Sequence, residues 1–378
     1  MKFLHTADWH IGRKLNGYSL LEEQEDVYKQ MLQIAKEEEV DGIIVAGDLY
    51  DRSVPSVDAV ALLNKMMIDM NLTHGFPVLA ISGNHDSGTR LETGAPWLKA
   101  SGFHLHTRLE QAFEPVEMTD VQFFLLPYFE PFHAREYFGD DSIRDIQTAM
   151  PLVIEEMMKC FDDTKRQVLV GHFFATGSSK GESETPLEVG GLDNVPLNVL
   201  DVFDYVALGH LHSPNALTQS EKIKYSGSLL KYSLSEENQT KGVRLVTFNE
   251  VGMEQQFYPV TPLRDVKQLT ASFETLVSKA YYESIPRENY YGITLTDKTV
   301  IVDVLNQLRD IYPNIISLER AHLKKASHHS LVSDNDTEGS LKPEELIKRY
   351  YEEVASVPLT EGQKDWLEQS IIEYKKER

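Results

Sequence analysis

Hydrophobic and polar positions repeat one local pattern through the first 250 residues: a short apolar run, a polar cluster, and then an amphipathic stretch with helical spacing. The apolar runs are rich in Val, Ile, Leu and Phe, and they predict buried strands at 2–6, 42–46, 78–82, 168–171 and 205–208. The amphipathic stretches predict helices at 20–39, 56–70, 88–101 and 143–161. Strands that alternate with helices favour an α/β domain with layered sheets.

The pattern changes near residue 242, where the helices stop. Two strand-like runs at 243–248 and 254–260 flank Asn249-Glu250-Val251-Gly252, which is a hairpin signal. After Pro262 we expect a smaller α/β stretch with strands at 266–271, 293–296 and 315–319 and helices at 273–282 and 302–311. Ser, Asp, Asn and Gly then predominate, and two helices are expected at 343–355 and 361–377. The sequence therefore predicts four parts: 1–262, 263–325, a linker at 326–342, and a helical segment at 343–378.

Composition narrows the class of protein. The 378 residues are 41% hydrophobic, which is enough for an ordinary core. No apolar run approaches the ~18 residues of a membrane span, and no signal peptide is visible. The single cysteine, Cys160, excludes an internal disulfide framework and thiolate metal sites. We therefore expect a cytoplasmic protein with no membrane partner.

Charge restricts the partners. The formal net charge is −22, and residues 1–260 hold 21 basic against 39 acidic side chains, a net −18. Such a surface repels nucleic acid and anionic membranes unless bound metal ions or a basic partner reverse the sign locally.

Polar residues able to bind metals follow five of the predicted strands directly. They are Asp8-Trp9-His10, Gly47-Asp48-Leu49-Tyr50-Asp51, Gly83-Asn84-His85-Asp86, Gly171-His172 and Gly209-His210-Leu211-His212. Ligands gather at the carboxyl ends of strands in α/β sheets, so these five sets are expected to converge. Carboxylate, imidazole and amide oxygen without thiolate suit Mn²⁺, Fe²⁺ or Zn²⁺, and the hard oxygens favour Mn²⁺. Taken singly, only Gly-Asn-His-Asp and Gly-His-Leu-His are more than weak evidence, but the ordered set of five points to a metal centre.

This ordered set resembles the calcineurin-like metallophosphoesterase superfamily, whose pattern is D-x-H, G-D, G-N-H-[DE], G-H and G-H-x-H. The resemblance implies a two-sheet sandwich flanked by helices, with 1–262 as the catalytic domain and 263–325 as a small α/β capping domain. It also implies that 343–378 is a helical pair that docks a partner; the alternative, which the spacing of its apolar residues fits equally, is a pair that folds back on the capping domain.

The resemblance further implies two divalent ions, most simply Mn²⁺. One ion would take Asp8, His10 and His212, the other Asn84, His172 and His210, and Asp48 would bridge them. His85 occupies the position of the family's histidine that is not a ligand and that acts on the phosphoryl oxygens or the leaving 3′-oxygen. Asp86 would help to position the ligands without binding a metal ion itself.

Two features remain open at this point. Some relatives carry a histidine where this chain has Asp51, so Asp51 either orients another group or caps the helix that begins near Ser56. Near the motifs, basic residues outnumber acidic ones in one stretch, whose candidates for DNA contact are Lys222, Lys224, Lys231, Lys241 and Arg244; a solvated face is the alternative.

The function that the resemblance implies is a Mn²⁺-dependent DNA nuclease, a 3′–5′ double-strand exonuclease and single-strand or hairpin endonuclease in DNA end processing, repair and recombination. Its expected partners are DNA and a coiled-coil ATPase, with two copies of this chain in a heterotetramer at the nucleoid. The alternatives are a metallophosphoesterase for phosphoproteins or small phosphate esters, which the −18 charge favours, and a scaffold of the same fold without metals.

Overall fold

The computed structural model describes residues 1–179, 194–321, 348, 351 and 358–376. They divide into two compact units, Met1–Val266 and Lys267–Arg378, which we call the first and the second unit. The predicted linker at 326–342 and nearly all of the predicted helix at 343–355 lie outside the described residues.

A six-stranded sheet forms one layer of the first unit, in the order β15-β14-β1-β4-β5-β6. β1, β4, β5 and β6 are parallel to one another, whereas β14 is antiparallel to both β1 and β15. The strands are β1 (Lys2–Thr6), β4 (Gly42–Ala46), β5 (Val78–Ile81), β6 (Phe103–His106), β14 (Gly242–Phe248) and β15 (Met253–Pro259). The predicted hairpin at 249–252 is confirmed, and Asn249 Oδ1 accepts the backbone N–H groups of Val251 and Gly252 at 2.9 Å each.

A five-stranded sheet forms the second layer, in the order β13-β12-β9-β8-β7. Only β7 runs antiparallel to its neighbour, β8. The strands are β7 (Val116–Met118), β8 (Val121–Leu125), β9 (Arg166–His172), β12 (Tyr205–Gly209) and β13 (Ile223–Tyr225). All five predicted strands before residue 210 therefore exist, and they are divided between the two sheets.

The two sheets face each other across one apolar core. Phe3, Ile44 and Ile81 of the first sheet share this core with Phe123 and Val170 of the second, and all five are essentially inaccessible to water. The rings of Phe3 and Phe123 meet edge to face with centroids 5.5 Å apart. Burial of these apolar runs on the inner faces is the main favourable term that holds the sandwich closed.

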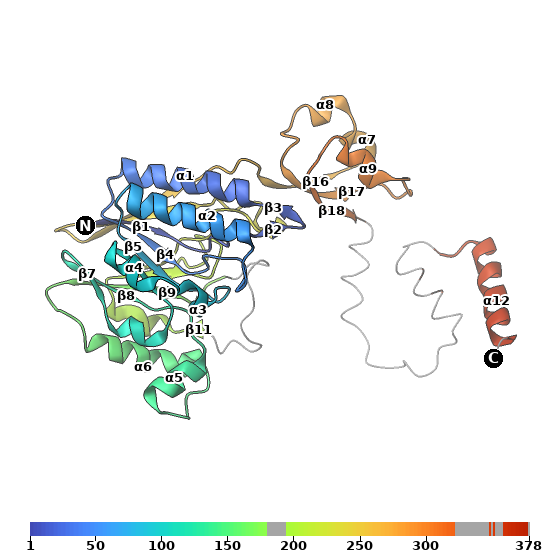
Figure 1. Cartoon of the computed structure of the whole chain (residues 1–378). Coiled ribbons are helices and arrows are strands. Elements are labelled where there is room, and N and C mark those ends of the chain that lie inside the picture. Colours follow the sequence, from blue (N-terminus) through green and yellow to red (C-terminus); the bar gives the residue numbers. More distant parts are fainter. Residues whose placement is uncertain (180–193, 322–347, 349–350, 352–357, 377–378) are drawn as a thin grey trace. The chain divides into compact units, whose positions relative to one another are not determined.

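Helices cover the outer faces. Figure 1 shows α1 (Leu21–Glu37) and α2 (Val57–Met67) along the six-stranded sheet, with α5 (Pro131–Phe138) and α6 (Ile146–Met158) on the far side of the other sheet. α2 continues as a π-helical turn, η1 (Ile68–Thr73). One predicted helix is wrong as a single element: Gly94, with a left-handed φ of 88°, separates α3 (Gly88–Leu91) from α4 (Ala95–Ala100).

Short elements complete the first unit. They are β2 (Lys14–Leu15), β3 (Tyr18–Ser19), β10 (Phe174–Ala175), β11 (Asn194–Val195), and the 3₁₀ turns η2 (Leu109–Phe113), η3 (Leu197–Val202) and η4 (Leu234–Glu236).

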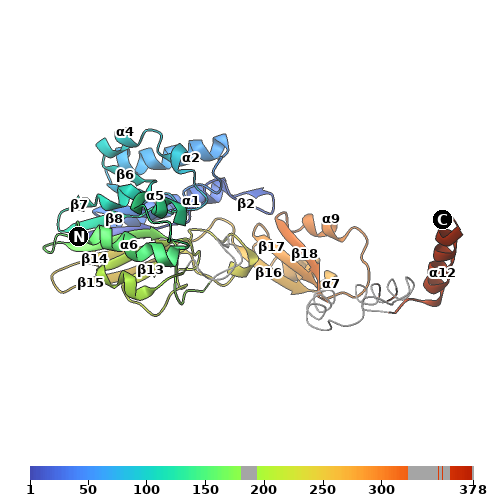
Figure 2. The same cartoon turned by 90° about the horizontal axis from the view of Figure 1, so that it is seen from below.

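The second unit contains a three-stranded sheet in the order β16-β17-β18 (Figure 2). Its elements are β16 (Val266–Ala271), α7 (Phe273–Leu276), α8 (Lys279–Tyr282), β17 (Tyr290–Leu295), α9 (Val304–Arg309) and β18 (Ile315–Arg320). β17 and β18 are parallel, as expected for strands joined through a helix. The predicted helix at 361–377 is present as α12 (Glu361–Lys376).

Candidate metal centre

The motif residues meet at the carboxyl ends of the strands in both sheets. Asp8 and His10 follow β1, Asp48 follows β4, Asn84 and His85 follow β5, His172 ends β9, and His210 and His212 follow β12. Residues more than 200 positions apart in the chain are in direct contact here, as His10 is with His212.

Unusual backbone conformations aim several of these side chains. Asp8, His10, Asp48 and His210 have φ angles of 53°, 44°, 52° and 92°. They are half of the non-glycine residues with positive φ in the part of the chain that the structure describes. Each such conformation costs on the order of 1–3 kcal/mol, and such strain concentrates at functional sites.

Two glycines let the loops approach each other. A Cβ on Gly83 would overlap the backbone nitrogen and carboxylate of Asp48, and a Cβ on Gly47 would overlap the ring of His172. Gly47 also has a φ of 89°, which disfavours any side chain. The glycine that precedes each of these motifs is therefore required by close packing of one ligand loop on another.

Asp8, His10 and His212 form the first cluster. The structure brings one ligand atom from each to within 4.8 Å of the others. His10 Nε2 and His212 Nε2 lie 3.1 Å apart. Asp8 is held from behind because the backbone N–H of His210 donates to both of its carboxylate oxygens, at 2.9 and 3.2 Å.

Asn84, His172 and His210 form the second cluster. Asn84 Oδ1 lies 3.0 Å from His172 Nε2 and 2.9 Å from His210 Nδ1, and these two nitrogens are 3.3 Å apart. Asp48 lies between the clusters, with Oδ2 at 3.5 Å from His10 Nε2 and 3.3 Å from His172 Nε2.

The position of the ring proton on His172 indicates that a cation binds between the two clusters. Its Nδ1 lies 2.8 Å from the carbonyl oxygen of Ala46, which can only accept, so Nδ1 carries a proton. In the neutral ring the Nε2 lone pair therefore points at two further acceptors, Asn84 Oδ1 and Asp48 Oδ2. Three lone pairs that converge in a buried space repel one another unless a positive charge lies among them.

The titration behaviour of the site has the same cause. Burial lowers the pKa of His172, but the neighbouring Asp48 carboxylate outweighs burial and raises it to about 9. Burial favours a neutral Asp48, yet His172 and His10 hold the pKa of that carboxyl below its usual range. Burial raises the pKa of Asp8 to about 6 and lowers the pKa of His10 and of His210. When no metal is bound, the positive charge that the site needs comes from a proton on His172, and a bound metal ion would supply positive charge in its place.

Two buried ring nitrogens, His10 Nδ1 and His210 Nε2, have no hydrogen-bond partner among the described residues. In each of these rings the other nitrogen is the one that meets the neighbouring ligand atoms. The donor set of carboxylate, imidazole and amide oxygens thus fits divalent metal ions.

His85 and Asp51 lie beside the first cluster. His85 Nδ1 lies 2.9 Å from the backbone carbonyl oxygen of Asp51, and the His85 and His10 rings meet edge to face at 4.7 Å. The Asp51 carboxylate accepts from Arg13 at 2.9 Å. The cap of α2 is Ser56, whose hydroxyl accepts from Ala59 N–H, so Asp51 does not cap this helix.

Asp86 connects two ligand loops. Its carboxylate accepts the backbone N–H groups of Leu49 and Tyr50, after β4, at 3.0 and 2.9 Å, and that of Gly83, after β5, at 2.9 Å. Burial, with a smaller contribution from Asp48, raises the pKa of Asp86 to about 7. Asp86 thereby fixes the loop of Asp48 against the loop of Asn84.

Sequence reasoning missed Glu236. This buried carboxylate has Oε1 at 3.4 Å from His212 Nδ1 and Oε2 at 2.5 Å from Lys241 Nζ. Burial raises the pKa of the Glu236 carboxyl, but Lys241 and His212 outweigh burial and lower it. No spacing rule could have found it, because Glu236 lies in the short 3₁₀ turn η4, 24 positions from His212.

The structure contradicts part of the predicted DNA-contact set. Lys241 is buried against Glu236, and Arg244 is buried and donates to the carbonyl oxygens of Tyr225 and Pro214. Neither cation can reach a phosphate.

The other three lysines of the set differ in accessibility. Lys231 is largely buried, and it pairs with Asp265 at 2.8 Å. The Lys222 side chain is 33% exposed and that of Lys224 only 12%; they pair at longer range with Asp201 and Glu221, at 3.4 and 3.9 Å, and both remain candidates.

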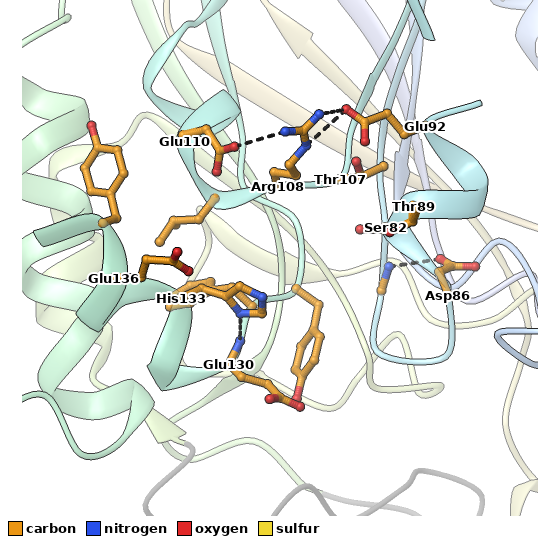
Figure 3. Close-up of a pocket in the computed structure, with 16 residues that line it drawn as sticks. Ser82, Asp86, Thr89, Glu92, Thr107, Arg108, Glu110, Glu130, His133 and Glu136 are labelled. Atoms are coloured by element: carbon orange, nitrogen blue, oxygen red, sulfur yellow. Dashed lines mark hydrogen bonds and ion pairs between the residues drawn. The ribbon is translucent and has the colours of Figure 1, made fainter. Parts of the chain in front are cut away.

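A pocket of about 860 Å³ lies beside the loop that carries Asn84, where Ser82, Gly83 and Asp86 belong to its lining (Figure 3). Gly83 and Asp86 form part of the lining, which also includes four glutamates: Glu92, Glu110, Glu130 and Glu136. Arg108 is the arginine of this lining, and it is paired with Glu92 and Glu110. The pocket is therefore acidic, and polyanions are disfavoured there.

Comparisons with known proteins identify the family of the chain. The family model described as calcineurin-like phosphoesterase matches residues 1–214, and that described as type 5 capsule protein repressor C-terminal domain matches 262–355. The chain therefore belongs to the calcineurin-like phosphoesterase family and is a metal-dependent phosphoesterase. No helix among the described residues is long and apolar enough to cross a membrane.

A curated relative places the chain more narrowly. The chain is 36% identical over 369 residues to the SbcD subunit of the nuclease SbcCD from Staphylococcus epidermidis, a match that covers 97% of this chain and 96% of the relative. The chain thus falls in the SbcD branch of the family.

Solved structures of lower similarity also match. The protein TT1561 of Thermus thermophilus is 12% identical with a TM-score of 0.38, covering 68% of this chain and 98% of that one. A dimetal phosphatase from Danio rerio is 12% identical with a TM-score of 0.42, covering 69% and 99%.

Proposed function

We propose that this chain is a Mn²⁺-dependent nuclease that hydrolyses phosphodiester bonds of DNA. The observation that carries the proposal is the convergence of buried acceptor atoms from five strand ends, which requires positive charge at that place. The relative's name, which contains the word nuclease, supports the substrate class. By the same resemblance the activity is 3′–5′ exonucleolytic on double strands and endonucleolytic on single strands and hairpins.

The residues divide between two ions. Asp8, His10 and His212 would hold one and Asn84, His172 and His210 the other, while Asp48 reaches toward both clusters. Divalent cations held there would bind opposite sides of a phosphodiester and make hydroxide available near neutral pH. Mn²⁺ is our choice among such ions because three of the seven ligands are hard oxygen donors.

His85 would act on the substrate rather than on the metals. Because its Nδ1 donates to the Asp51 carbonyl, the neutral ring carries its lone pair on Nε2. Through that nitrogen His85 would exchange a proton with the leaving 3′-oxygen or, when protonated, stabilise the phosphoryl oxygens. Asp51 and Arg13 keep the ring in place from behind.

Charge determines how DNA reaches the site. The negative charge of the acidic pocket in Figure 3 repels a polyanion from that part of the surface. The net charge of −18 in residues 1–260 also disfavours the binding of free DNA. Lys222 and Lys224 would contact the backbone, and the remaining affinity would come from a partner.

We propose that this partner is an SbcC-type coiled-coil ATPase. Residues 1–262 would be the catalytic domain, 263–325 the capping domain and 326–342 the linker, while 343–378, which includes α12, would dock the ATPase. Removal of residues beyond Gly339 should leave hydrolysis of a small diester at full rate and abolish co-purification with the ATPase. Undiminished binding of the truncated chain would show that 343–378 does not dock it.

A second copy of this chain would complete a heterotetramer. Apolar side chains are exposed on α2, η1 and α4: Val57 is 84% exposed, Trp97 is 80% exposed, and Ile68 and Leu72 are exposed as well. We propose that these side chains take part in the contact with the second copy, since contacts of this kind use contiguous apolar surface. We place the assembly in the cytoplasm at the nucleoid, where its DNA substrate lies.

The acidity of the chain favours one other function, hydrolysis of phosphoproteins or small phosphate esters. A Mn²⁺ titration of activity on linear plasmid DNA, beside bis-p-nitrophenyl phosphate, distinguishes the two. In the presence of the ATPase partner, a nuclease should degrade the DNA. Activity that is confined to the small diester would overturn our proposal. A scaffold without metals should cleave neither, and the seven intact ligands argue against it.

A further inference from the structure

A buried ion pair lies directly behind one proposed metal ligand. Glu236 is 1% exposed and Lys241 is 4% exposed, and their charged atoms are 2.5 Å apart. Apolar residues of similar volume often fill such a space at equal or lower free energy, because both charges must be desolvated. Stability alone therefore does not explain why a carboxylate and an ammonium occupy this position.

The pair closes a ring around His212. Glu236 Oε1 faces His212 Nδ1 at 3.4 Å, and Lys241 Nζ donates to the backbone carbonyl of the same histidine at 2.8 Å. Ser228 joins the ring, since its N–H donates to that carbonyl at 3.1 Å and its hydroxyl accepts from Lys241 at 3.0 Å. Both the imidazole and the backbone of His212 are thus held by one charged pair.

We propose that Glu236 and Lys241 are positioning residues for the metal ion that His212 binds. Glu236 fixes the tautomer with the proton on Nδ1, so that the Nε2 lone pair points toward His10 and the ion; Lys241 balances the carboxylate charge. This inference rests on the proposed function, because it requires His212 to be a ligand. A carboxylate behind a ligating imidazole raises its basicity, and its loss typically costs 10–100-fold in metal affinity.

The two metal sites are therefore unequal. His172, in the second cluster, is held at Nδ1 by the neutral carbonyl of Ala46, whereas His212 is held by a full negative charge. Loss of the Glu236 charge should weaken the ion at Asp8, His10 and His212 selectively. A purely structural role for the pair predicts no such selectivity.

Calorimetric titration of MnCl₂ into the chelator-treated full chain tests the inference. Glu236→Gln with Lys241→Met removes both charges, so neither is left buried alone, and should lower the affinity of one of two sites roughly 10–100-fold. The second site should stay within about twofold of wild type. Glu236→Asp, which keeps the carboxylate, should recover most of the lost affinity.

The matched control is Glu23→Gln with Arg264→Met, which removes another buried carboxylate and its bonded arginine in the same unit. It should leave both Mn²⁺ affinities unchanged. Should the double variant at 236 and 241 fail to fold, Glu236→Leu with Lys241→Met, which fills the space with apolar side chains and leaves neither charge buried alone, measures the same change in Mn²⁺ affinity. If the Mn²⁺ affinities of both sites fall equally, or if neither falls, the positioning role is wrong. Absence of two Mn²⁺ sites in the wild type would overturn the proposed function itself.

Discussion

Asp86 offers the sharpest test of how the metal centre is assembled, because its side chain joins the backbones of two ligand loops. Its carboxylate accepts three backbone N–H groups, two from the loop of Asp48 and one from the loop of Asn84. Asp86→Ala leaves those three donors without their acceptor. We expect the two loops to lose their fixed spacing, and with it the geometry shared by Asp48 and Asn84.

The magnitude follows from the three bonds. An unsatisfied buried donor costs about 1–3 kcal/mol, and Asp86 is only half-buried, so water can replace part of the loss. We therefore expect Asp86→Ala to lower the free energy of unfolding by about 3 kcal/mol. Asp86→Asn should be nearly as harmful, since its NH₂ group would face backbone donors at one of the two oxygen positions.

Urea unfolding and Mn²⁺ calorimetry on the same samples measure both effects. The control is Asp204→Ala, which removes a half-buried carboxylate that accepts the Gln167 backbone N–H at 2.8 Å near the opposite end of β9. The control should retain wild-type Mn²⁺ affinity. If Asp86→Ala also keeps wild-type stability and Mn²⁺ affinity, the loops are positioned by something other than this carboxylate.

Two further predictions concern histidines that are not assigned to a metal. His85→Ala should still bind two Mn²⁺ ions but should lose on the order of 10²–10⁴ in hydrolysis rate, and a calorimetric loss of one ion would instead make His85 a ligand. Burial, with a contribution from Arg244, lowers the pKa of His5 to about 3. As the pH falls, His5 is therefore protonated in the unfolded chain before it is protonated in the folded chain, and the free energy of unfolding decreases below about pH 6.5. Between about pH 7.5 and 5.0 the wild type should lose about 2 kcal/mol more than His5→Gln in urea unfolding; equal losses would show that His5 does not titrate as a buried neutral ring.

The sequence was most informative about the site because each ligand lies at the end of a strand or within a few residues after it. Apolar runs such as 42–46 fix where the strand ends, and the residue after the glycine must then lie at the carboxyl edge of the sheet. This rule does not depend on which sheet holds the strand. It therefore placed Asp48 and His210 correctly although they come from different sheets.

Features that depend on tertiary packing could not be predicted in this way. β6 (Phe103–His106) alternates apolar residues with histidines and gives too short a signal. Lys241 and Arg244 looked like surface cations, because a charged residue in a sequence gives no sign that a buried carboxylate or backbone carbonyl is its partner. Glu236 was missed for the same reason.

The measurement that tests the central claim most directly is Mn²⁺ binding and hydrolysis by Asp48→Asn. Asp48 is the residue that approaches both clusters, with Oδ2 at 3.5 Å from His10 Nε2 and 3.3 Å from His172 Nε2. Calorimetry should find two Mn²⁺ ions in the wild type and weakened binding at both sites in the variant, which should remain folded and should not hydrolyse DNA. Near-normal Mn²⁺-dependent nuclease activity in Asp48→Asn would contradict the two-metal account.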